Sequence, residues 1–417
     1  MPVRYQLPLS LLLLIFSAPV WAFKKVDLDY RVTLLPQSNQ AQVSITLEQG
    51  NAVRVLDFDL GEQRYYSDFT GDGQWSTAPA QQGSGLRGIW KPASGKATLT
   101  YKVLINRPAA NTSPDKPRFD SRITPDWAVF RGEDLVPNAR LDQQEGVRLQ
   151  SRLSIDLPNG WKSVETAWPR IGKNRFRIDN VSRLFDRPTG WIAAGHLINR
   201  RTRLGDTEVT VSAPRGQGMR RMEALTLLTF VWPTLHNVFA RTPGKLLVVS
   251  AGDSMAINAS AAHDSIFVHS NRPLISESGA SPFLRELVRT VGRIRSRDRS
   301  DWIGAAIAEY YSVELVRRAG GMSEERYQDW QSIITRVGRK VTSLRGDHAD
   351  PAITARATLM LVALDQEIRQ KTNGGKSLDD LVKGLMRMGP VSTDDVVQLA
   401  NGLIDEPSSA LSMNLLQ

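Results

Sequence analysis

Apolar and polar residues alternate with a period of two from Phe23 to about Ser212. Turn residues, such as those at 70–73 and 158–160, separate the alternating runs. Successive side chains of a strand point to opposite faces of a sheet, so the pattern indicates many short, half-buried strands. We therefore expect an antiparallel β-sandwich or saddle-shaped sheet in the first half of the chain. The alternating apolar positions include Val43, Ile45, Leu47, Leu99, Tyr101, Val103, Ile105, Val147, Leu149, Leu153, Ile155, Leu157, Val209 and Val211.

The pattern changes after the segment 213–218, which contains one proline and two glycines and which we expect to be a hinge. Two strand-like runs remain, at 246–250 and 265–269, and from about Ser281 the apolar spacing is helical. Helix starts are marked by capping residues followed by proline or by acidic residues. These caps are Ser281, Ser323, Asp350, Ser377 and Ser392. We expect helices near 282–296, 302–318, 323–344, 351–372 and 377–388, with a short one after Ser392.

The first 22 residues are typical of a secretory signal peptide. Arg4 supplies the positive start, the apolar core is densest at 11–16, and Val20 and Ala22 are small residues at −3 and −1 of the expected cleavage site. The core is short for a bilayer span of about 20 residues. We therefore predict three segments: a signal peptide at 1–22, a β-rich N-terminal domain at 23–213 and a mainly helical domain at 219–417, an α+β architecture.

A second apolar run, at 225–232, is bounded by charged residues and followed by Pro233. This pattern favours a buried or amphipathic helix over a membrane span. We expect the mature protein to be periplasmic or secreted, without stable membrane insertion. The net charge of +10 falls by one when Arg4 is removed, and no nucleic-acid module accompanies it. We therefore expect no nucleic-acid partner.

Cysteine is absent and only five histidines occur. Disulfides, cysteine nucleophiles, thiolate zinc sites and iron–sulfur clusters are therefore excluded. The histidines offer no H-x-H pair and no i,i+4 pair, although His263 and His269 flank a strand-like run and share one face. The five are His196, His236, His263, His269 and His348. The histidine spacing therefore predicts no metal site.

Two neighbouring segments nevertheless resemble the core of the thermolysin-like zinc aminopeptidases. Those enzymes carry H-E-x-x-H on one helix and W-x-N-E-G-x-A-E-Y-Y on the next. Here the corresponding segments are 284–289, Leu-Arg-Glu-Leu-Val-Arg, and 302–311, Trp-Ile-Gly-Ala-Ala-Ile-Ala-Glu-Tyr-Tyr. The resemblance implies a β-domain followed by a helical, thermolysin-like peptidase domain (the gluzincin fold).

Further segments resemble the glycyl aminopeptidase family in particular. The run 363–369 matches its L-D-x-x-[IL]-R pattern, and 374–381 contains the Gly-Gly-Lys-Ser-Leu-Asp-Asp that follows it. Upstream, 184–188, Leu-Phe-Asp-Arg-Pro, is similar to the family's D-S-P motif. The resemblance covers roughly 30–400, and we expect no C-terminal PDZ domain of the kind this family carries, since the sequence stops at Gln417.

The catalytic positions depart from the pattern that the resemblance implies. Arg285 and Arg289 stand at the two histidine positions, and Ala305 stands where the third zinc ligand, a glutamate, is expected. Glu286 alone matches, at the general-base position. A guanidinium has no lone pair to give a metal. The resemblance therefore implies a degenerate member that lacks the zinc ligands, with no cofactor, although the family's cofactor is zinc.

Other positions in the motifs also differ from the zinc-aminopeptidase pattern. Gly304 replaces an asparagine, and the expected oxyanion tyrosine falls near Ile353 and Thr354. The 15 residues between Arg289 and Ala305 are fewer than such enzymes usually have, so the connecting loop is shortened or rebuilt. We expect Tyr310 and Tyr311 to be core residues.

Three interpretations of the arginines remain open. They can form a solvated helix face; they can fill the former metal cavity and pair with Glu286 and Glu309; or they can bind an anion such as a peptide carboxylate. We accordingly predict a binding cleft at Arg285, Arg289 and Glu309, with Glu286 a vestigial base. The function predicted is that of an exported pseudoenzyme binding a peptide or envelope protein. The alternative is an active hydrolase using Glu286 and an unidentified metal arrangement, and the oligomeric state is left open.

Overall fold

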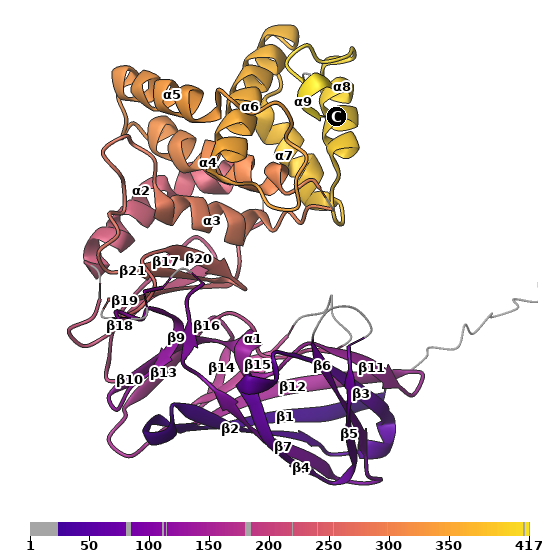
Figure 1. Cartoon of the computed structure of the whole chain (residues 1–417). Helices are drawn as coiled ribbons and strands as arrows, with labels where there is room; N and C mark the ends of the chain where they lie inside the picture. Colours follow the sequence, from indigo (N-terminus) through magenta and orange to yellow (C-terminus); the bar gives the residue numbers. More distant parts are fainter. Residues whose placement is uncertain are drawn as a thin grey trace, which may run out of the picture.

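A computed structural model describes residues 24–80, 85–110, 112–113, 115–179, 185–218, 220–239, 241–252, 254–297, 299–411 and 413–416. The predicted signal peptide at 1–22 lies outside these residues and stays a prediction. The described chain forms four β-sheets and a layer of helices (Figure 1).

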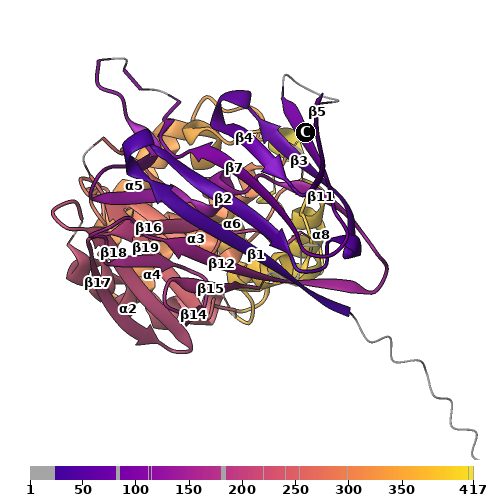
Figure 2. The same ribbon diagram turned by 90° about the horizontal axis from the view of Figure 1, so that it is seen from below.

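The first sheet has seven strands and carries the period-two pattern of the N-terminal sequence. Its order is β14 (Arg170–Gly172), β15 (Arg175–Ile178), β12 (Val147–Asp156), β1 (Lys24–Leu35), β2 (Gln40–Leu47), β7 (Ala97–Leu104) and β4 (Tyr66–Gly71). Figure 2 shows these long strands crossing the lower face of the molecule. The pair β1–β12 is parallel, whereas β1–β2 and β2–β7 are antiparallel.

A second, four-stranded sheet shares its core with the first. Its order is β11 (Ala139–Gln143), β3 (Val53–Gly61), β6 (Leu86–Pro92) and β5 (Gly73–Pro79). Tyr30 and Ile45 of the first sheet and Phe58 and Trp90 of the second belong to one buried apolar cluster. Burial of alternate side chains from two sheets in one cluster explains the period of two.

The third and fourth sheets pack on each other. The third has the order β13 (Ser163–Thr166), β16 (Trp191–Gly195), β10 (Trp127–Arg131), β9 (Phe119–Ile123) and β8 (Arg107–Pro108), with the short helix α1 (Gly132–Leu135) after β10. The fourth has the order β17 (Leu197–Leu204), β18 (Thr207–Pro214), β19 (Lys245–Ala251), β21 (Ser265–His269) and β20 (Ala259–Ala262). Val129, Trp191, Leu247 and Phe267 form an apolar cluster between them.

The predicted hinge lies within the path of the fourth sheet. β18 includes its first two residues, 213 and 214, β19 comes later in the chain, and the two strands pair in parallel. The crossover between them is α2 (Arg221–Val238), which contains the apolar run 225–232. α2 buries Leu225, Leu228 and Trp232, as an amphipathic helix does. Within the described residues no helix is long and apolar enough to cross a membrane.

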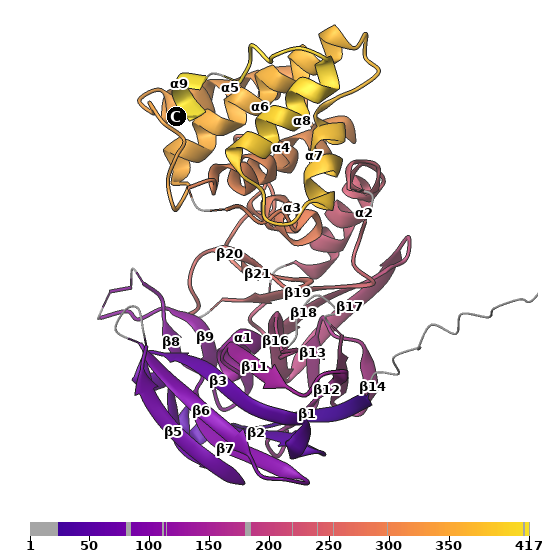
Figure 3. The ribbon, with the colours of Figure 1, turned by 90° about the vertical axis from the view of Figure 1, so that its right-hand side faces the viewer.

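Together with α2, the helix α3 (Pro282–Gly292) packs on the other face of the fourth sheet, and the remaining helices lie beyond these two (Figure 3). The remaining helices are α4 (Trp302–Arg318), α5 (Glu324–Gly338), α6 (Pro351–Lys371), α7 (Leu378–Arg387), α8 (Thr393–Ile404) and α9 (Met413–Leu416). Ser281, Ser323, Asp350, Ser377 and Ser392 each accept a backbone N–H bond in the first turn, as predicted. The α+β class is therefore confirmed, while the domain limits 23–213 and 219–417 stay predictions.

Two helices end earlier than the sequence predicts. α3 stops at Gly292 because Arg293 adopts a left-handed conformation with φ 48°. α5 stops at Gly338, where a β-carbon would lie 2.8 Å from the Arg356 nitrogen of α6. Close backbone contact between α5 and α6 thus coincides with the end of the helix.

Candidate functional site

The candidate site lies on α3, whose sequence separates an apolar face from a charged one. Phe283, Leu284 and Leu287 are buried in the core shared with the fourth sheet, as their helical spacing predicts. Ser281 caps the helix by accepting the Leu284 N–H at 3.0 Å. This packing leaves Arg285 and Arg289 partly exposed and directs them to the side where α4 passes.

The structure brings the four predicted site residues together in a single ionic cluster. The Arg285 Nη1 lies 3.4 Å from the Glu309 Oε2, and its Nε lies 3.5 Å from the Glu286 Oε1. The Arg289 Nε lies 3.9 Å from that same Glu286 oxygen. Two cations therefore face two anions, which is the arrangement of the second interpretation. The distances are long for charge-assisted hydrogen bonds, so the cluster is loose.

Glu286 also bonds to a neighbouring strand, which the sequence does not indicate. Its Oε2 accepts the backbone N–H of Ala261 at 3.0 Å, and Ala261 lies in β20 at the edge of the fourth sheet. Only 6% of the Glu286 surface is exposed. Both carboxylate oxygens are therefore engaged, one by a strand edge and one by the two guanidinium groups.

Ala305 and Gly304 line a small cavity beside this cluster. The cavity has a volume of about 280 Å³, and Arg289, Arg295 and Asp301 also line it. The Asp301 carboxylate accepts the Ala349 N–H at 2.8 Å and so helps to seat the start of α6. The cavity thus occupies the region where the resemblance implies a metal ligand, and cationic side chains outnumber acidic ones in its wall.

The residues at the implied zinc position do not fit a zinc ion. Zinc sites need imidazole, carboxylate or thiolate donors in tetrahedral arrangement, whereas Arg285 and Arg289 offer no lone pair and Ala305 offers no donor. Glu286 and Glu309 are held by arginine. Within the described part of the chain no three His, Asp or Glu side chains are grouped so as to hold a metal ion.

The two histidines that the sequence places on one strand face have separate neighbours. His263 stacks on Trp168 with ring centroids 4.4 Å apart. His269 is buried, and its Nδ1 accepts the Asn271 N–H at 3.1 Å. Burial, with Arg118 and Arg272 nearby, lowers the pKa of His269, so its neutral form is favoured.

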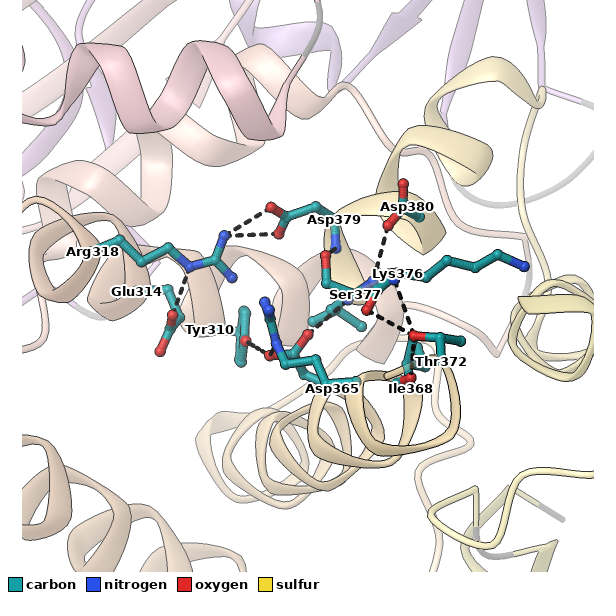
Figure 4. Close-up of polar contacts among 12 residues, drawn as sticks. Tyr310, Glu314, Arg318, Asp365, Ile368, Thr372, Lys376, Ser377, Asp379 and Asp380 are labelled. Atoms are coloured by element: carbon teal, nitrogen blue, oxygen red, sulfur yellow. Dashed lines mark hydrogen bonds and ion pairs between the residues drawn. The ribbon is translucent and has the colours of Figure 1, made fainter. Parts of the chain in front are cut away.

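The motif residues that carry the resemblance meet in a polar network between α4, α6 and the start of α7 (Figure 4). The Tyr310 hydroxyl donates to the Asp365 Oδ2 at 3.1 Å, and the Leu378 N–H donates to the Asp365 Oδ1 at 2.7 Å. Arg369 Nε adds a bond of 2.9 Å to the same carboxylate. Burial raises the pKa of Tyr310 well above its usual value, so its hydroxyl stays a donor.

Asp379, from the Ser-Leu-Asp-Asp segment, forms the second half of this network. It accepts the Tyr311 hydroxyl at 2.7 Å, and the Arg318 Nη1 contacts its two oxygens at 2.9 and 2.8 Å. Arg318 also donates through Nε to Glu314 at 2.8 Å. Tyr310 and Tyr311 are both buried, which confirms that they are core residues. In this chain the network ties helices together.

The upstream Asp-Arg-Pro segment also has a structural position. Leu184 lies outside the described residues, but the Asp186 carbonyl accepts the buried Tyr30 hydroxyl of β1 at 2.9 Å. At the implied oxyanion position, the Ile353 N–H donates to the Asp350 cap, and the Thr354 hydroxyl donates to the Ala349 carbonyl at 3.5 Å. Both contacts lie within the first turn of α6.

No family model and no curated protein sequence matches this chain. Solved structures do resemble it. An aminopeptidase N family protein from Idiomarina loihiensis has a TM-score of 0.67 at 13% identity over 89% of this chain and 72% of its own. The M1 zinc metallopeptidase from Deinococcus radiodurans has a TM-score of 0.56 at 15% identity, over 93% and 91%. Native leukotriene A4 hydrolase from Saccharomyces cerevisiae has a TM-score of 0.59 at 13% identity, over 94% and 66%.

At 13–15% identity, this likeness shows a shared fold and does not show a shared activity. The predicted resemblance to zinc aminopeptidases is therefore confirmed at the level of the fold. The likeness spans the β-rich and the helical parts together, since it covers about nine tenths of this chain.

Proposed function

We propose that this chain is an exported, non-catalytic protein with the fold of a zinc aminopeptidase, and that it acts by binding a peptide or an envelope protein. The narrower relation to the glycyl aminopeptidases, as a degenerate member, is part of this proposal. The observation that carries it is the ionic cluster of Arg285, Glu286, Arg289 and Glu309 at the position where the resemblance implies zinc.

The state of Glu286 supports a non-catalytic role. A general base in peptide hydrolysis needs an oxygen within hydrogen-bond distance of the attacking water. Here one oxygen accepts the Ala261 N–H, and the other faces Arg285 and Arg289. Freeing it would leave the Ala261 N–H without its acceptor and would remove the Glu286 carboxylate from both arginines, of which Arg285 keeps Glu309.

Binding is supported by the side of the cluster that faces solvent. Arg289 is the more exposed of the two arginines, with 45% of its side chain accessible, and it lines the small cavity together with Arg295. Guanidinium groups bind carboxylates through paired donors. A cavity of about 280 Å³ with two arginines in its wall can hold the carboxylate of a bound peptide.

Export is proposed from the N-terminal sequence. A short apolar core after Arg4, with small residues before the expected cleavage site, favours secretion to the periplasm or beyond. A partner would then be another exported protein or peptide. The basic surface implied by the net charge favours an acidic one.

The proposal is tested by assaying hydrolysis of aminoacyl p-nitroanilides and short peptides in the presence of added zinc. We expect turnover no greater than that of a Glu286→Gln variant under the same conditions. Turnover at least tenfold above that variant would overturn the non-catalytic assignment and support the hydrolase alternative.

A further inference from the structure

A large cleft lies where the third and fourth sheets meet the helical layer. It has a volume of about 1210 Å³. Its walls come from the β13–β14 connection, from the start of β19, from the segment after α3 and from the segment after α7. The lining residues used below are Glu165, Trp168, Arg170, Arg177, Asp179, Arg201, Glu208, Arg241, Lys245, His263, Asp264, Arg293, Arg295, Met386 and Met388.

Positive charge exceeds negative charge in this cleft. Seven Lys and Arg side chains line it against four Asp and Glu. Three of the four carboxylates are already neutralised: Glu165 pairs with Arg201, Asp264 with Arg293, and Asp179 with Arg177. Glu165 is 3% exposed, so its charge is directed inward to its partners.

Of the four remaining cations, Arg170 also lies near Glu165, at 3.7 Å, which leaves three in the wall. Within the described residues no carboxylate oxygen lies within 4.0 Å of Arg241, Lys245 or Arg295. Lys245 is half-buried, and its Nζ contacts only the Trp168 carbonyl at 3.5 Å. Burial lowers the pKa of Lys245, because its charged form has lost part of its hydration. The carboxylates of Glu165 and Glu208 favour the charged form of Lys245 from a longer distance, and a ligand carboxylate in direct contact would favour it further.

The cleft also presents apolar and aromatic surface next to these cations. The stacked rings of Trp168 and His263 form one part of the wall. Met386 and Met388 form another, and Met388 is 41% exposed. Methionine adapts its shape to different partners. A ligand that alternates carboxylates with apolar groups fits this surface better than a uniformly charged polyanion.

Arg295 connects the cleft with the small cavity beside the ionic cluster, because it lines both. We propose that the cleft binds an acidic peptide segment, with its carboxylates on Arg241, Lys245 and Arg295 and its apolar side chains on the two methionines. This inference rests on the proposed binding function and names its ligand class. It also places the main binding surface beyond Arg285 and Arg289, the residues that the sequence indicates.

The test is fluorescence anisotropy with a labelled ten-residue peptide of alternating Glu and Leu, and with a matched peptide that carries Gln in place of every Glu. We expect saturable binding of the acidic peptide, weakening as salt is raised, and at least tenfold weaker binding of the Gln peptide. The double variant Arg241→Gln/Arg295→Gln should weaken acidic-peptide binding at least tenfold. Both side chains are exposed, so the variant is expected to fold.

The control is Arg339→Gln/Lys340→Gln, which removes two exposed charges at the end of α5 and should change the affinity less than twofold. Equal binding of the two peptides, an unchanged affinity in Arg241→Gln/Arg295→Gln, or displacement by tripolyphosphate at lower concentration than by unlabelled peptide would each overturn the proposal. Zinc-dependent turnover with intact cleft binding would refute the proposed function alone. Absence of turnover together with absence of peptide binding would refute the cleft alone.

Discussion

Two polar clusters of the helical layer are built from similar residues and differ in tightness. The network around Asp365 and Asp379 uses hydrogen bonds of 2.7 to 3.1 Å between three helices. The cluster around Glu286 uses arginine contacts of 3.4 to 3.9 Å on the face of α3. Motif residues of the zinc-peptidase pattern occur in both regions. In the first region they hold helices together, and in the second they form the loose ionic cluster on α3.

The contacts that stabilise the helical layer are therefore independent of a metal site. Tyr310, Asp365 and Asp379 contribute to packing whether or not a metal site exists. In the cluster around Glu286 the charges of Arg285 and Arg289 are balanced by Glu286 and Glu309 at long distance. Stability and the candidate chemistry thus depend on separate residues.

Removing the central carboxylate of the tight network should have the largest effect. Asp365→Ala leaves the Tyr310 hydroxyl and the Leu378 N–H without their acceptor in a buried place. We expect a loss of about 3 kcal/mol in the free energy of unfolding. Urea denaturation measures it, with the exposed Asp329→Ala of α5 as a control that should change stability by less than about 0.5 kcal/mol. A loss below about 1 kcal/mol for Asp365→Ala would remove the contrast between the clusters.

Substitution in the loose cluster around Glu286 should lower the free energy of unfolding less than Asp365→Ala does. Glu286→Ala removes the acceptor of the Ala261 N–H and one carboxylate beside each arginine, while Arg285 keeps Glu309, so we expect a loss of about 1–2 kcal/mol in the free energy of unfolding. Glu286→Gln keeps an amide oxygen for the Ala261 N–H and should lose about half as much. If the two variants are equally unstable in urea, the ionic contacts, and not the strand bond, hold Glu286 in place.

Acid should weaken a third, tight set of contacts. Glu367 of α6 accepts bonds from Ser408, Ser409 and Ala410, and these lower its pKa from the usual 4.5 to about 2 despite partial burial. Its contribution to stability is therefore complete above the unfolded pKa and is lost as pH falls from about 4.5 to about 2. Thermal melts across this range should fall less steeply in Glu367→Gln. Parallel curves for the variant and the unchanged chain would show that these bonds contribute no pH dependence.

Much of the fold could be predicted from the sequence because local patterns determine it. The period of two marks the strands of the first two sheets, and the capping residues fix helix starts such as those at Pro282 and Pro351. Helix ends were harder, since α3 stops at the left-handed Arg293 and α5 stops where α6 passes closely. Neither cause is visible in local spacing.

The candidate site could be predicted only in part. The resemblance to the zinc-aminopeptidase motifs indicated Arg285, Glu286, Arg289 and Glu309 as site residues, and the structure brings them together. The bond from Ala261 could not be foreseen, because it depends on where the edge of the fourth sheet meets α3. The large cleft could not be foreseen for a similar reason: Arg241 and Lys245 precede or begin β19, Arg295 follows α3, and the three share no motif.

Zinc stoichiometry, measured by mass spectrometry after zinc loading and desalting, tests most directly whether the residues around Arg285, Arg289 and Ala305 can hold a zinc ion. We predict well below one equivalent for the unchanged chain, and close to one for the variant Arg285→His/Arg289→His/Ala305→Glu, which restores the donors at positions beside an existing cavity. One equivalent of zinc in the unchanged chain, lost in Glu309→Gln, would show that the ionic cluster does hold zinc.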